Sequence, residues 1–172
     1  MKIHTMINAQ QDVPCLVRFT SAATHDYTFS KELDLRKGSF VVFDKGYVDY
    51  LQYHRWTLDD IYFVTRQKDN AVYKSLEEFD IDESTHSGIL KDERIEITKD
   101  KQAITLRRVA FYHQEQNKVY EFISNNFELK ADTIAEIYKQ RWQIETLFKR
   151  LKQNFPLKYF LGDNQNAIEI QI

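Results

Sequence analysis

The stretch ADTIAEIYKQRWQIETLFKRLKQ, residues 131–153, is the segment around which the rest of the chain is organised. Its interior consists of residues that favour helices, such as Ala, Glu, Gln, Lys and Leu. Asp132 or Thr133 can cap the first turn, and Pro156 follows the last turn and stops it. We therefore predict one long amphipathic helix over residues 131–153.

Rotation of about 100° per residue divides this helix into three sectors. The expected core stripe consists of Ile137, Ile144, Leu147, Phe148, Leu151 and Phe155. The opposite face, which we expect to meet solvent, carries Lys139, Gln143, Thr146 and Arg150. Between these two faces lies a sector with Tyr138, Arg141, Trp142, Glu145, Lys149 and Lys152.

The intermediate sector places one carboxylate, Glu145, among cations and two aromatic rings. Cations with rings suit contacts to phosphates and bases, and a carboxylate among them suits a metal ion. The alternative is a solvated face with ion pairs at i,i+4 spacing, such as Arg141–Glu145 and Glu145–Lys149. Spacing alone leaves both interpretations open.

A second informative segment begins with the apolar run at residues 40–43, which predicts a strand buried on both faces of a sheet. Asp44 follows the run, and Gly46 lets the backbone turn at once. Ligands gather at the carboxyl ends of strands in open α/β sheets, which makes Asp44 a candidate site residue. The alternative is a turn or N-cap role for Asp44 before a helix at residues 49–56. A further strand is expected at residues 61–65.

The remaining segments predict mostly β structure. Residues 2–7 and 15–20 predict a hairpin-like pair, and residues 28–35 a short helix. Residues 66–120 alternate between apolar and charged residues, which predicts an antiparallel meander with one wet face. At the end of this meander, residues 118–124 are expected to return the chain to the core sheet. Arg107 and Arg108 are expected on a solvated strand face, with DNA contact as the alternative.

Composition narrows the classes of protein. A chain of 172 residues suits one domain, or one domain with a modest insertion. The net charge of −2 gives no global argument for nucleic acid, but residues 138–158 hold six Lys and Arg against one acid, which weakly favours DNA there. Cys15 is the only cysteine, so an internal disulfide is excluded, and the five histidines lack zinc-site spacing. No apolar run approaches the ~20 residues of a membrane span.

Two motifs resemble one protein family. The pattern Tyr138-x2-Arg141-x3-Glu145-x6-Lys152 resembles the Y-R-E-K signature of DDE transposases of the insertion-sequence-four family, and Trp142 matches a common feature beside it. The passage VVFDKGYVDY…IYFVTR, residues 41–66, resembles the second-aspartate region of the same family. Two distant regions match in the right order, so the resemblance is stronger than either motif alone.

The resemblance implies a mixed α/β fold with a partial ribonuclease-H-like core. Residues 1–65 and 120–172 would form this core, and residues 66–119 would form an antiparallel β insertion. It also implies catalytic and metal-binding roles for Asp44 and Glu145, the second and third acids of a triad that holds Mg²⁺ or Mn²⁺. The DNA-binding residues that it implies are Tyr138, Arg141, Trp142, Lys149 and Lys152.

By the same resemblance, the activity is metal-dependent DNA strand cleavage and strand transfer, in the bacterial cytoplasm near the nucleoid. The partners are DNA, as transposon ends and target, and a second copy of the intact parent in a homodimer. Asp12 and Asp26 do not match the family's first-acid motif, so we expect a fragment that is weak or inactive alone. We also expect an open sheet edge beside residues 2–7 and hence self-association.

Two other functions compete with this one. The first is a non-catalytic DNA-binding remnant or transposition inhibitor, which would lack a metal site. The second is an unrelated α+β interaction protein whose helix face is merely solvated.

Overall fold

The computed structural model describes residues 2–8, 13–21, 23, 25–81 and 88–154; within its elements, the side chains of residues 143–154 and of several positions before residue 28 are outside the description. Its strands are β1 (Lys2–Asn8), β2 (Val13–Thr20), β3 (Phe40–Phe43), β4 (Tyr62–Arg66), β5 (Lys74–Glu78), β6 (Ile89–Lys99), β7 (Gln102–His113) and β8 (Lys118–Ser124). Its helices are α1 (Tyr27–Ser30), α2 (Tyr50–Leu58) and α3 (Ala131–Asn154), with a 3₁₀ turn η1 (Lys45–Tyr47).

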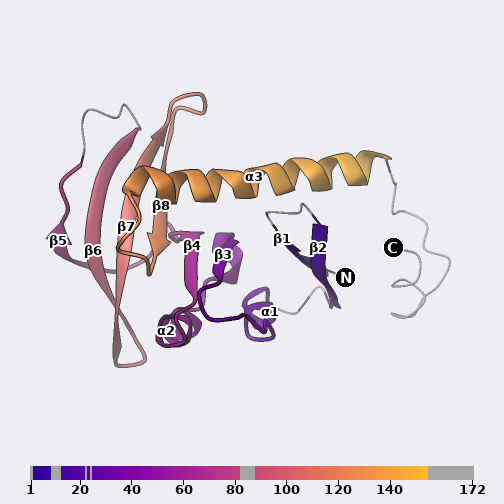
Figure 1. Ribbon diagram of the computed structural model, residues 1–172, viewed down its shortest axis with the longest axis horizontal. Helices are drawn as coiled ribbons and strands as arrows, with labels where there is room; N and C mark the ends of the chain where they lie inside the picture. Colours follow the sequence, from indigo (N-terminus) through magenta and orange to yellow (C-terminus); the bar gives the residue numbers. More distant parts are fainter. Residues whose placement is uncertain (1, 9–12, 22, 24, 82–87, 155–172) are drawn as a thin grey trace.

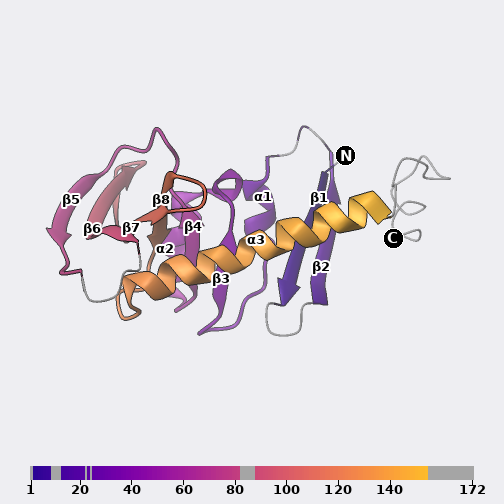
Figure 2. The same ribbon diagram turned by 90° about the horizontal axis from the view of Figure 1, so that it is seen from above.

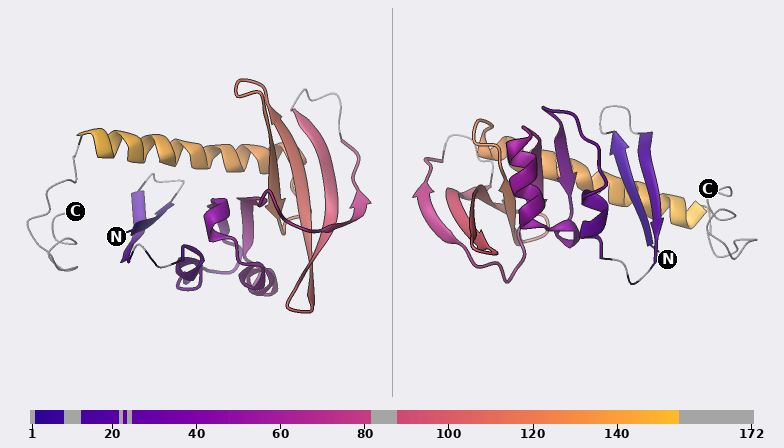
Figure 3. Two further views of the ribbon diagram at one scale, coloured as in Figure 1. Left: turned by 180° about the vertical axis from the view of Figure 1, so that it is seen from behind. Right: turned by 90° about the horizontal axis from the view of Figure 1, so that it is seen from below.

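Six of these strands form one mixed sheet in the order β3-β4-β8-β7-β6-β5, while β1 and β2 form a separate antiparallel pair (Figure 1). Only β3 and β4 run parallel among the described strands. The mixed α/β fold is thus confirmed, as are the N-terminal hairpin and the return of β8 between β4 and β7. The strands of the predicted insertion, β5 to β7, extend the same sheet in a curved outer part (Figure 3).

The sheet carries one hydrophobic cluster on each face, because alternate residues of a strand point to opposite sides. Tyr53 and Trp56 of α2 pack on the face that includes Phe63 of β4. Ile134 and Tyr138 of α3 pack on the other face. Seen from above, α3 crosses the sheet and continues past β3 toward the hairpin (Figure 2).

Helix α3 agrees with the predicted bounds within one residue, and Ile137 of the predicted core stripe packs against the α3 cluster, but the most buried face of the first half was not predicted. The described buried residues are Ile134, Ala135 and Tyr138, whereas Ile137 is only half-buried. The prediction extended the apolar stripe of the second half backward, while the first half packs on the sheet with a neighbouring face. For this reason Lys139, expected in solvent, is half-buried with its Nζ 4.5 Å from the Phe111 ring centre. The other predicted core positions lie outside the described side chains.

Strand β3 differs from its prediction in one respect. Val41 and Phe43 pack toward the α2 cluster and Val42 toward the α3 cluster, so both faces are covered. Among the described strands, however, β3 lies at the edge of the sheet, and Phe40 is 37% exposed. An apolar run signals two covered faces but carries no information about the hydrogen-bonding edge. The helix expected at residues 28–35 is also shorter, because Leu33 and Leu35 pack against the α2 cluster from outside any helix.

Arg107 and Arg108 correct both expectations made for them, because each is buried and ion-paired within the protein. Arg107 donates two hydrogen bonds to the Asp92 carboxylate, from Nε at 2.8 Å and from Nη2 at 2.6 Å. Arg108 pairs with Glu93 at 2.5 Å and also with Glu121. Acids on the neighbouring strands supply partners on both faces, so the meander has no wet face from Leu106 to Phe111. No helix among the described residues is long and apolar enough to cross a membrane.

Candidate functional site

Asp44 stands at the carboxyl end of β3, where the chain enters η1. Its backbone is extended and its Oδ1 accepts a hydrogen bond from Lys45 N at 2.7 Å, which caps η1. The capping role considered from sequence is therefore real, and it also fixes the half-buried carboxylate at the strand end. Gly46 leaves room for the Asp26 side chain, because a Cβ at residue 46 would lie 3.3 Å from Asp26 Oδ2.

Tyr138 connects α3 to this strand end. Its hydroxyl donates to Asp44 Oδ1 at 3.4 Å, a long contact between residues 94 positions apart. The side chain is fully buried, with its ring centre 4.7 Å from that of Phe122. Burial raises the pKa of Tyr138 to about 12; Asp44 adds to this rise, while Arg141 and Arg66 oppose it. The structure thus joins the two segments that the sequence singled out.

Arg141 and Trp142 follow on the same helix. The Arg141 guanidinium carbon lies 5.1 Å from the centre of the Tyr138 ring, a cation–π arrangement. The Trp142 ring is 5.1 Å from Tyr120 and 5.3 Å from His113. Trp142 is therefore half-buried against rings of β7 and β8, and the predicted stacking on a base would add to or replace these contacts.

The backbone of α3 places the other predicted residues on the Tyr138 face. Glu145 comes seven residues after Tyr138, which is close to two turns, and Lys152 seven residues after that. Lys149 is one turn after Glu145. The side chains of Glu145, Lys149 and Lys152 lie outside the described residues, so their contacts with Asp44 or DNA stay predictions.

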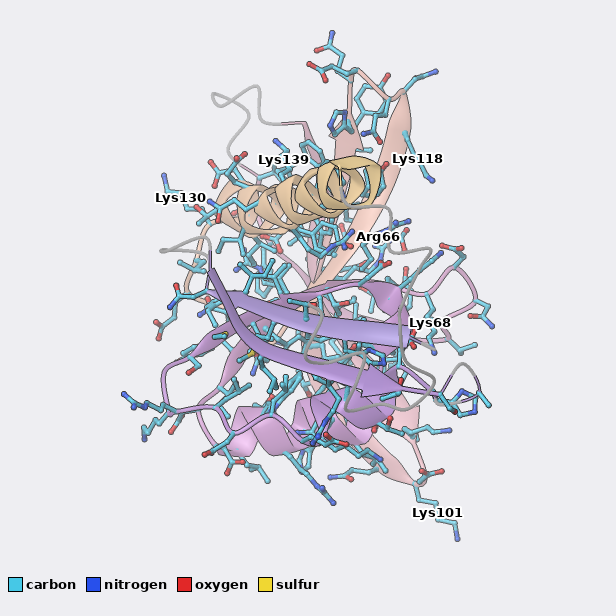
Figure 4. The ribbon with its side chains drawn as sticks, turned by 90° about the vertical axis from the view of Figure 1, so that its right-hand side faces the viewer. Arg66, Lys68, Lys101, Lys118, Lys130 and Lys139 are labelled. Atoms are coloured by element: carbon cyan, nitrogen blue, oxygen red, sulfur yellow. The ribbon has the colours of Figure 1, made fainter. Side chains whose placement is uncertain are left out.

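Two cations missed by sequence reasoning flank the Tyr138 region. Arg66, at the end of β4, holds its guanidinium carbon 5.0 Å from the Tyr120 ring centre, and Lys118 Nζ of β8 lies 5.4 Å from it. Figure 4 shows both beside α3, with Lys101 at the far end of the molecule. Arg66 ends β4 and Lys118 begins β8. The two cations lie near each other because β4 pairs with β8, which the sequence does not reveal.

Charges of both signs lie near η1: after burial, the charges of Asp26 and Asp44 raise the pKa of Tyr47, and Lys45 contributes a cation. Lys45 Nζ pairs with Asp69 Oδ2 at 2.9 Å. This hydrogen bond and the charge of Lys45, with smaller effects of Arg66 and Lys118, lower the pKa of the exposed Asp69 carboxyl. An open depression of about 440 Å³ beside this pair is lined by Lys45, Gly46, Lys68, Asp69 and Asn70. Lys45 and Lys68 in this lining are suited to contact phosphate groups.

Asp44 has the chemistry of one metal ligand. Both of its described hydrogen bonds fall on Oδ1, so Oδ2 is available to a divalent cation that prefers carboxylate oxygen. No three His, Cys, Asp or Glu side chains gather as a metal site within the described residues, a set that does not include the Glu145 side chain. A metal would therefore require Glu145 or another ligand in addition.

Comparison with known proteins gives consistent relatives. The family described as "Transposase DDE domain" matches residues 1–172. "Putative transposase y4zB" of Sinorhizobium fredii is 30% identical over the whole chain and 49% of its own length. "Probable transposase for insertion sequence element IS5377" of Geobacillus stearothermophilus is 25% identical over the whole chain and 46% of its own length. "Putative transposase for insertion sequence element IS4SA" of Synechocystis is 28% identical, again over the whole chain and 49% of its own length. The chain spans about half the length of these curated relatives.

Proposed function

This chain belongs to the transposase DDE domain family, and we propose that it is part of an enzyme for DNA transposition that cleaves and joins DNA strands with divalent metal ions. The observation that carries the proposal is the contact between Tyr138 and Asp44. It brings the acid at the end of β3 under the helix that carries Arg141 and Glu145, although the two segments are far apart in sequence.

Asp44 and Glu145 are the residues that would hold the metal, Mg²⁺ or Mn²⁺. When bound, divalent ions activate the attacking oxygen and stabilise the leaving oxygen of a phosphoryl transfer. The hydrogen bond from Lys45 N keeps the Asp44 carboxylate at the strand end. Tyr138, neutral and buried, adds a second donor without adding charge.

The cations around this strand end would bind the DNA backbone. Arg141 is held on the face of the Tyr138 ring, and Arg66 and Lys118 on the Tyr120 ring. Ring contacts of this kind limit the motion of a long cationic side chain and so lower the cost of ordering it on a phosphate. We expect Lys149 and Lys152 to continue this surface along α3.

Metal binding tests the proposal without requiring turnover. We expect Mn²⁺ titration, followed by electron paramagnetic resonance, to detect a site that Asp44→Asn and Glu145→Gln each weaken at least ten-fold. Asp69→Asn is the matched control, because it removes a nearby exposed carboxylate that pairs with Lys45 instead. Unchanged Mn²⁺ affinity in Asp44→Asn would contradict the proposed site. DNA binding without any metal site would support the non-catalytic remnant.

A further inference from the structure

The turn between β8 and α3 is tied to the rest of the fold by two buried asparagines. Asn125 Oδ1 accepts from Phe63 N at 3.0 Å, and its Nδ2 donates to Ile61 O at 2.8 Å and to Thr57 Oγ1 at 3.0 Å. One side chain thus connects the turn to β4, to the residue before it and to α2. Strand β4 in turn pairs with β3, which ends at Asp44.

Asn126 shapes the chain just before α3. Its Oδ1 accepts from Glu128 N at 3.0 Å and from Leu129 N at 2.8 Å. Its own backbone N donates to Ser124 Oγ at 3.0 Å, and Ser124 Oγ donates to Phe63 O at 2.7 Å. The geometry of the turn is therefore set by side chains rather than by a regular helix cap.

Arg107 of β7 holds the same turn from the other side. Its Nη1 donates to Leu129 O at 2.5 Å and lies 3.4 Å from Asn126 O. Its remaining nitrogens make the two bonds to Asp92 that fix the plane of the guanidinium. A planar fork anchored at one end can position a carbonyl at the other end, which a lysine ammonium cannot do.

From these contacts we infer that Arg107 and Asn126 are positioning residues, which set the start of α3 so that Tyr138 meets Asp44. Ala131 begins the helix two residues after Leu129, and Tyr138 lies two turns further along. Because a helix moves as a rigid rod, a shift at its start moves Tyr138 by a similar amount. This role would explain why the Arg107–Asp92 ion pair is buried between β6 and β7. The inference rests on the proposed function in one respect, namely that the enzyme uses the Tyr138–Asp44 contact.

Arg108 provides an internal control for this role. It is the next residue of the same strand, is equally buried and is also ion-paired, but it points to the opposite face. Its partners are Glu93, Glu121 and the Tyr73 ring, and among its described contacts none belongs to α3 or to the turn before it. Loss of Arg108 should therefore reduce stability without moving α3.

Quenching of tryptophan fluorescence by acrylamide monitors how α3 packs on the sheet, through Trp142. Trp56, the chain's other tryptophan, is 2% exposed and should contribute little to the quenching. We expect Arg107→Lys to raise the acrylamide quenching constant at least two-fold and to speed amide exchange in residues 131–142 at least ten-fold. Arg108→Lys should lower the urea midpoint but leave both readouts unchanged. Asn126→Ala should behave like Arg107→Lys, and Asn126→Asp, which keeps the acceptor oxygen, should restore the native values.

If Arg107→Lys and Arg108→Lys change the quenching constant and the amide exchange of α3 equally, both arginines contribute only to stability. That result would overturn the positioning role. An unchanged α3 in both Arg107→Lys and Asn126→Ala would do the same. If Arg107→Lys does not fold, the two Asn126 variants decide the question. None of these readouts uses metal or DNA, so the inference can fail while the proposed function stands, and the reverse.

Discussion

At the scale of single residues, Tyr138 links packing to the charge of Asp44. Its folded-state pKa of about 12 lies above the ordinary value of 10.0, mainly because the ring is buried. The folded state therefore holds the phenol proton more tightly. The resulting stabilisation is fully present below pH 10 and is lost as the pH rises from 10 toward 12, by about 1.4 kcal/mol per pH unit.

Tyr138→Phe tests this linkage. We expect the free energy of unfolding, measured with urea, to fall between pH 8 and pH 11 in both proteins. The fall should be larger in the native protein than in the variant, by about 1.4 kcal/mol at pH 11. Tyr47, Tyr50 and Tyr53, whose pKa values are also raised by burial, contribute equally to both proteins and cancel. Parallel curves for the two proteins would show that Tyr138 is accessible to water.

Arg66 and Lys118 act at the same scale, as individual charges beside α3. If each contacts a phosphate, Arg66→Gln and Lys118→Gln should weaken DNA binding and lower the slope of log affinity against log salt by about one each. Lys101→Gln is the control, because Lys101 is an exposed cation at the far end of the molecule (Figure 4). The test is anisotropy with labelled duplex at several salt concentrations. Equal loss in all three variants would indicate only a general charge effect.

At the scale of elements, His4 of β1 connects the β1–β2 hairpin to η1 and to α1. His4 is 2% exposed; its Nδ1 lies 2.9 Å from Tyr47 OH and its Nε2 2.8 Å from Thr20 Oγ1. Its ring also stacks on Phe29 at 5.1 Å. Two-stranded hairpins are marginally stable alone, and another described link of this pair, Arg18–Glu32, is a solvent-exposed ion pair, so the buried His4 contacts should contribute most to keeping the hairpin ordered.

We expect His4→Ala to speed amide exchange in β1 and β2 at least ten-fold while the six-stranded sheet keeps its protection. Thr5→Ala, the next position on the same strand with its side chain on the other face, is the control and should change little. Hydrogen-exchange mass spectrometry resolves the two regions. Unchanged hairpin protection in His4→Ala would mean that other contacts hold it.

The elements also show how far sequence reasoning reached. The bounds of α3 and the hairpin follow from local patterns, and both were predicted. The burial of Arg107 and Arg108 was missed because their partners Asp92, Glu93 and Glu121 look like ordinary charges of solvated strands. The pairing of Asp44 with Glu145 stays a prediction from resemblance. The contact of Asp44 with Tyr138 joins residues 94 positions apart, and no local pattern encodes it.

At the scale of the whole molecule, the described sheet has two outer strands, β3 and β5, with different surfaces. Every residue of β5 is exposed and three of the five are charged, which discourages pairing with another chain. Strand β3 is apolar throughout, and Phe40 on it is 37% exposed. The sheet is therefore expected to associate through β3, either with another strand of the whole protein or with a second copy.

Phe40→Lys should suppress such association, because a charge beside an open edge opposes strand pairing. We expect sedimentation velocity over a hundred-fold concentration range to show self-association of the native chain and a mainly monomeric Phe40→Lys. Leu58→Lys is the matched control: it places the same charge on a residue that is 71% exposed and ends helix α2 instead of lying on a strand. Association that persists in Phe40→Lys but disappears in Leu58→Lys would assign the contact to the helix face, and a native chain that stays monomeric would remove the β3 edge as a pairing surface.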